Sequence, residues 1–129
     1  MFKNWLGRVG LTAVAAVAMI AGVGTPAFAG DTYLILSDID GHQVGHMVHV
    51  DDGDTFRIYD DQADGYGPTG YLQVYAPAGP VTWVTLASKH NSSGAGHYVS
   101  FQYDVLEGIP YRMRLCHELV GCANQPFNE

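Results

Sequence analysis

Turn-forming residues divide residues 30–129 into short segments, and this spacing is what most constrains the fold. Gly, Pro and Asp recur about every ten residues, as in DDGD at 51–54 and PAGP at 77–80. No apolar stripe of helical period persists between these turns, so long helices are not expected. The intervening segments are rich in Val, Ile and aromatic residues, which favour strands. We therefore expect an all-β chain of about seven short strands, in an antiparallel β-sandwich.

The alternation of apolar and polar residues places the expected strands. They cover residues 32–37, 44–50, 56–59, 71–75, 81–87, 98–106 and 111–116. The tail is expected to add a short edge strand held by Cys122. Residues 91–96 (NSSGAG) are expected to form an exposed, flexible loop, in which Asn91 begins a glycosylation acceptor pattern.

Residues 1–29 have the features of a secretory signal peptide. Lys3 and Arg8 precede an apolar run, and Ala27 and Ala29 flank Phe28 in an A-x-A cleavage pattern. The run of about 15 residues is shorter than the ~20 that a membrane helix needs, although an uncleaved signal anchor is the alternative. We expect cleavage after Ala29, which leaves one secreted domain at 30–129. No apolar run in that domain is long enough to span a membrane.

The charge balance excludes several classes of partner. The chain has a net charge of −7, and all 13 acidic residues lie after residue 29. The cations in that part are Arg57, Lys89, Arg112 and Arg114. Such a surface repels phosphate backbones and anionic lipid, so nucleic-acid binding is not expected. It suits a cation site or a partner with a basic patch.

Two cysteines in an exported domain are expected to pair. Cys116 and Cys122 enclose a short loop, and an oxidising compartment favours the bond between them. Their spacing is not C-x-x-C, and no second cysteine pair is present, so a redox or metal pair fits less well.

The segment LEGIPY at 106–111, followed by alternating Met113 and Leu115, resembles the corner before a late strand in fibronectin-III-like and immunoglobulin-like sandwiches. The resemblance implies that the Tyr111 hydroxyl turns back onto the preceding connection. It supports the sandwich fold and assigns no activity.

A second resemblance rests on short motifs in the leader and in two parts of the expected domain. The Asp-Gly turns of residues 50–72, the Ala-rich leader and the cysteine pair after a Y-x-M-x-L-C strand resemble small secreted proteins of filamentous actinobacteria. The roles of those proteins are uncharacterised. The resemblance implies export and a small β-domain, and it transfers no catalytic residue.

Acidic turns suggest one cofactor, calcium, with Asp60, Asp61 and Asp64 as candidate ligands. The third position of this loop is Gln62 and the twelfth is Tyr71, so an EF-hand is excluded. Loops at one end of a sandwich can still converge on calcium, with Asp38, Asp40 or Asp54 as further ligands. The alternative is that these aspartates only cap their own turns.

His42, His46 and His49 lie within eight residues, and a zinc or copper site shared by them is one alternative, which would require the expected strand to be broken there. His46 and His49 have opposite parity on the expected strand, so they point to opposite faces. We expect the histidines to lie at the surface and at strand edges.

Tyrosine is the last candidate for function. Tyr71 and Tyr75 share parity with Gln73, which puts them on one face, and Tyr66 lies in a glycine-rich loop. Tyrosine suits faces that bind sugars or proteins, although its preference for strands alone also explains its presence. These three residues are the candidate binding-face aromatics.

Together these features favour a non-enzymatic binding or surface-presentation module, with an extracellular protein or a glycan as partner. No G-x-S-x-G, H-E-x-x-H or P-loop motif is present, and no catalytic residue is nominated. The alternatives are a calcium-stabilised extracellular module and a small secreted hydrolase or protease inhibitor.

Overall fold

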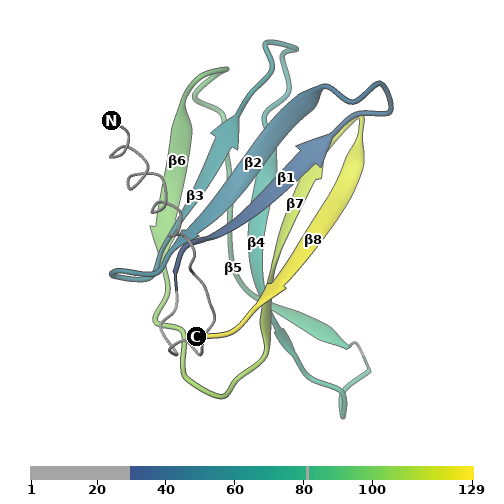
Figure 1. Cartoon of the computed structure of the whole chain (residues 1–129). Coiled ribbons are helices and arrows are strands. Elements are labelled where there is room, and N and C mark those ends of the chain that lie inside the picture. Colours follow the sequence, from purple (N-terminus) through teal and green to yellow (C-terminus); the bar gives the residue numbers. More distant parts are fainter. Residues whose placement is uncertain (1–29, 81) are drawn as a thin grey trace, which may run out of the picture.

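Short alternating segments and tight turns build eight antiparallel strands in two packed sheets (Figure 1). The computed structural model describes residues 30–80 and 82–129. One sheet has the order β1-β2-β3-β6, with β1 at Thr32–Ser37, β2 at Gln43–Val50, β3 at Thr55–Asp60 and β6 at Tyr98–Gln102. The other has the order β5-β4-β7-β8, with β4 at Thr69–Tyr75, β5 at Trp83–His90, β7 at Tyr111–His117 and β8 at Gly121–Phe127. The expected all-β sandwich is confirmed.

The strands differ from expectation mainly at their ends. The tail forms a full strand, β8, which pairs with β7 along its length. The strand expected at 98–106 ends at Gln102, because the chain then bonds to the β2–β3 turn. There the amides of Tyr103 and Val105 donate to the backbone oxygen and Oδ2 of Asp54. The expected signal peptide at 1–29, and Val81 of the fifth expected strand, lie outside the described residues.

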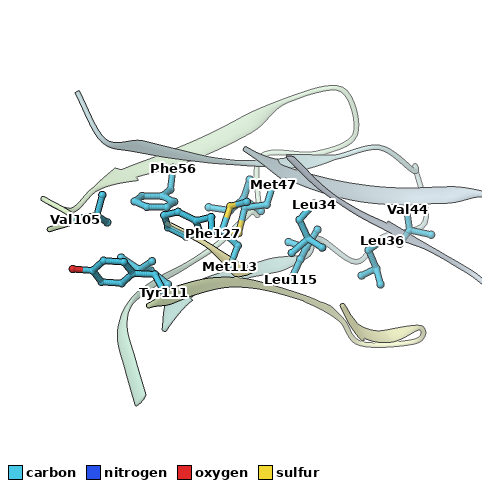
Figure 2. Packing of buried hydrophobic residues seen from close by; sticks show 12 residues of the cluster. Leu34, Leu36, Val44, Met47, Phe56, Val105, Tyr111, Met113, Leu115 and Phe127 are labelled. Carbon is cyan, nitrogen blue, oxygen red and sulfur yellow. The ribbon is translucent and has the colours of Figure 1, made fainter. Parts of the chain in front are cut away.

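The core lies between the sheets, where the inward side chains of both interdigitate (Figure 2). Met47, Phe56 and Ile58 from one sheet and Met113 and Leu115 from the other are fully buried. Each such side chain contributes roughly 1.5–3 kcal/mol by leaving water. The alternation that buries them also sends every second side chain of each strand outward.

Tyr111 forms the expected corner before β7. Its side chain is buried at one end of the core, and its Oη accepts a hydrogen bond of 2.9 Å from the Leu106 amide. The hydroxyl thus fixes the connection that brings the chain from β6 in one sheet to β7 in the other, as the resemblance to fibronectin-like sandwiches implies.

The expected disulfide is also confirmed. Cys116 and Cys122 are direct partners across the β7–β8 hairpin and are bonded to each other. The bond ties β8 to its sheet near the hairpin turn. Among residues 30–80 and 82–129, no helix has the length and apolarity to cross a membrane.

Residues 92–96 are exposed as expected, whereas Asn91 at the start of this loop is not. Its side chain is fully buried, and its Nδ2 donates to the carbonyl oxygens of Ile58 and His97, both at 2.9 Å. Its Oδ1 accepts hydrogen bonds from Ser93. Gly67 packs so closely that a Cβ there would overlap the carbonyl oxygen of Asn91. Asn91 therefore anchors the crossover from β5 to β6 and is shielded from modification.

Candidate functional site

The outward side of the β5-β4-β7-β8 sheet gathers aromatic, amide and cationic side chains. On β4, Leu72 and Val74 pack into the core. The residues that alternate with them, Tyr71, Gln73 and Tyr75, therefore point away from it. The strand register places Thr85 and Arg112 on either side of Gln73, and Arg114 beside Tyr71. We call this the aromatic–arginine face; it consists of Tyr71, Gln73, Tyr75, Trp83, Thr85, Arg112, Arg114 and Asn124.

Trp83 is the centre of the aromatic part of this face. The guanidinium carbon of Arg112 lies 4.5 Å from the centroid of the Trp83 ring, a cation–π distance. Tyr75 is the direct partner of Trp83 on the neighbouring strand β4; their rings lie 5.2 Å apart, and Tyr75 is 42% exposed. The guanidinium lies over one face of the Trp83 ring, and the Tyr75 ring is tilted by 57° to it, so this group combines apolar ring surface with a positive charge.

A row of hydrogen bonds fixes the polar part of the face. Arg112 Nε donates to Gln73 Oε1 at 2.7 Å, and Gln73 Nε2 donates to Thr85 Oγ1 at 3.0 Å. Arg114 Nη1 donates to Asn124 Oδ1 at 3.0 Å. These bonds hold both arginines against the sheet and so reduce the entropy lost when a ligand binds them.

The charge of this face is opposite to that of the rest of the domain. The four strands carry Lys89, Arg112 and Arg114 and no acidic residue. In the described part of the chain, the ion pairs within 4 Å all join histidine to aspartate, so neither arginine has a carboxylate partner. Burial, and then the charge of Arg114, lower the pKa of Arg112 below its ordinary value. Two adjacent guanidinium groups are therefore held without a neutralising anion.

The three aspartates proposed as calcium ligands bond to three different parts of the protein. Asp61 Oδ2 contacts the imidazole of His46, and Asp64 Oδ2 lies 2.9 Å from Nε2 of His117. Asp60 Oδ1 accepts a hydrogen bond from the Gln62 amide. The loop is thus fastened to β2 and to β7 by carboxylate–imidazole pairs. Calcium binding by these residues stays a prediction.

Asp60 and Tyr66 meet at a pocket of about 310 Å³ at one end of the sandwich. The pocket lies between the loop that follows β3 and the loop that follows β5, and His90 and Asn91 also line it. Asp61, Asp64, Tyr71 and Tyr75 do not line this pocket. The candidate residues thus lie in three places. Asp60 and Tyr66 line the pocket, and Asp61 and Asp64 pair with histidines. Tyr71 and Tyr75 lie on the aromatic–arginine face.

Two groups of described side chains bring metal-ligating atoms within 4.8 Å of one another. The first, Asp38, Asp40 and His42, occupies the turn before β2. There Asp38 Oδ1 already accepts hydrogen bonds from the amides of His42 and Asp40, and the His42 amide lowers the pKa of Asp38. This first group is an ordinary aspartate turn.

The second group lies at the β2–β3 turn and the end of β8 and consists of His49, Asp51, Asp54 and Glu129. Burial raises the pKa of the Glu129 carboxyl above its ordinary value, and the charges of Asp54 and Asp51 raise it further. From sequence, Asp54 was a possible calcium ligand and His49 a possible zinc or copper ligand with His42 and His46; the structure places His49 and Asp54 in one group.

The positions of two histidines differ most from what the sequence predicts. His46 and His49 do face opposite sides, because His46 stacks on Tyr59 at 4.1 Å and His49 stacks on Phe56 at 4.7 Å in the core. His49 and His117, however, are buried rather than at the surface. Each is satisfied by an aspartate from a loop, and these pairs depend on tertiary folding that periodicity does not reveal.

We compared the chain with known families, proteins and structures. No protein-family model, no curated protein and no solved structure matches this chain. The resemblance to secreted actinobacterial proteins stays a prediction.

Proposed function

We propose that this protein is a secreted, non-enzymatic binding module and that the aromatic–arginine face binds an anionic glycan. The pair of unneutralised guanidinium groups on Arg112 and Arg114 carries this proposal. A domain with 13 acidic residues that keeps acidic residues off one whole sheet presents a local attraction for negative charge.

The aromatic side chains favour a glycan over other anions. Sugar rings have an apolar face of C–H groups, which packs on aromatic rings such as Trp83 and Tyr75. Carboxylate or sulfate groups along the same chain can accept two parallel hydrogen bonds from a guanidinium. The face thus combines a stacking surface with charge-assisted donors at neighbouring positions, as an acidic polysaccharide requires.

The direct test is binding of purified protein to glycans that differ in charge. Polygalacturonate presents carboxylates, dextran sulfate presents sulfates, and dextran is a neutral control. We expect binding to one or both anionic glycans, no binding to dextran, and weakening as salt is raised. Binding to dextran with equal affinity would contradict the proposal, and so would cleavage of any of the three.

Variants locate the binding face. Losing a charge-assisted hydrogen bond costs about 1.5–3 kcal/mol, so Arg112→Gln and Arg114→Gln should each raise the dissociation constant roughly 10- to 100-fold. Arg57→Gln is the matched control, because Arg57 lies 5.1 Å from the ring of Tyr98 on the opposite sheet. Equal weakening by Arg57→Gln would place binding elsewhere. If the protein bound an acidic protein and neither anionic glycan, the proposed glycan partner would be wrong.

A further inference from the structure

The β2–β3 turn and the end of β8 bring four metal-ligating groups to one end of the core. His49 points inward from β2, is 1% exposed, and packs against Phe56 and Phe127, each at 4.7 Å between ring centroids. Its Nε2 lies 2.9 Å from Oδ1 of Asp54 in the following turn. A buried imidazole is thus held against apolar rings, with its ring nitrogen directed at a carboxylate.

Three carboxylates converge on this imidazole. One oxygen each of Asp51, Asp54 and Glu129 lies within 4.8 Å of the others and of a ring nitrogen of His49. No Lys or Arg of the described ranges forms an ion pair with any of them. Like charges this close repel one another, and the local sequence supplies no cation to offset the repulsion.

An unsatisfied atom gives an independent reason to expect a ligand. Oδ1 of Asp51 is fully buried and has no hydrogen-bond partner in the described structure. Buried polar atoms almost always find a partner, and a carboxylate oxygen without one carries a large desolvation cost. Glu129 is exposed, and Asp51 and Asp54 are half-buried, so the cluster reaches solvent. A pocket of about 360 Å³ adjoins Asp54 on the side of Asp104. An ion can therefore reach the cluster, and a cation bound through this oxygen of Asp51 would satisfy it.

We propose that His49, Asp51, Asp54 and Glu129 bind a divalent transition-metal ion of the zinc type. Zn²⁺ takes imidazole nitrogen and carboxylate oxygen at ~2.0–2.2 Å in a tetrahedral set, which places ligand atoms roughly 3.3–3.6 Å apart. Because the ligand atoms all lie within 4.8 Å of one another, no pair would have to close by more than about 1.5 Å. Calcium fits less well, because it prefers six to eight oxygen ligands and makes little use of imidazole. This site is separate from the aromatic–arginine face and does not depend on the glycan proposal.

The test measures Zn²⁺ binding by competition with a chromophoric chelator, on protein prepared without a histidine tag. We expect one equivalent to bind tightly, and a melting temperature roughly 10 °C or more higher at 100 times the dissociation constant. Asp51→Asn and Glu129→Gln should each weaken Zn²⁺ binding at least tenfold. Asp40→Asn, in the exposed Asp38–His42 turn, is the matched control and should leave binding unchanged.

The melting temperature in chelator separates a metal site from a purely structural cluster. Without metal, Asp51→Asn should melt at the same temperature as the parent or higher, because it removes one of three repelling charges. Undiminished Zn²⁺ binding in both variants would overturn the proposal, since the ion would then sit on other histidines. Stabilisation by Ca²⁺ but not by Zn²⁺ would overturn it as well.

Discussion

Replacing Asn91 by alanine should destabilise the domain severely, although sequence patterns place this residue in a flexible loop. The side chain makes four hydrogen bonds, donating to Ile58 and His97 and accepting two from Ser93. It is fully buried, so water cannot replace these partners. At about 1 kcal/mol for each bond, the expected loss is about 3–4 kcal/mol of unfolding free energy. That is a large part of the 5–15 kcal/mol typical of a domain.

The assay is reversible thermal or urea unfolding of purified variants, followed by circular dichroism. A loss of about 3 kcal/mol should lower the melting temperature by at least about 12 °C in a domain of this size. Asn91→Asp should be at least as damaging, because it turns an oxygen toward two carbonyl oxygens. Asn124→Ala, which loses a single exposed bond to Arg114, is the control and should shift stability by less than about 0.5 kcal/mol. Equal small shifts in Asn91→Ala and Asn124→Ala would refute the anchoring role.

Two further substitutions test the other contacts that join distant parts of the chain. Tyr111→Phe removes the partner of the Leu106 amide and should lower the unfolding free energy by about 1–2 kcal/mol in urea titration; no change would mean that the corner is held by packing alone. Asp64→Asn removes the carboxylate paired with the buried His117 and should lower the melting temperature equally in chelator and in millimolar calcium. A loss confined to calcium would instead support the calcium site at Asp60, Asp61 and Asp64.

Features set by neighbouring residues could be predicted from the sequence. The alternation in β2 and β4 assigns His46, His49, Tyr71 and Gln73 to the correct faces, since successive side chains of a strand point in opposite directions. The disulfide was predicted from the cysteine count together with the expectation of export. Both features depend on residues close together in the chain, so they do not require knowledge of how the strands pair.

Features set by strand register could not be predicted. His117 pairs with Asp64 across 53 residues, and Arg112 bonds to Gln73 across 39. Both contacts depend on how β7 aligns with β4 and with the loop before it. The sequence does indicate that Arg112 and Arg114 lie on the same face, because residues two apart on a strand point to the same side. That they face Tyr71 and Gln73 becomes visible only once the strands are paired.

Nuclear magnetic resonance can show residue by residue whether the aromatic–arginine face binds an anionic glycan. The protein would be labelled with ¹⁵N and titrated with oligogalacturonate, and with a sulfated oligosaccharide in parallel. We expect the indole N–H signal of Trp83 and the amide signals of β4 and β7 to shift with the anionic ligand, while those of β3 and β6 stay in place. Shifts confined to β3 and β6, or to the loop at 60–67, would contradict it.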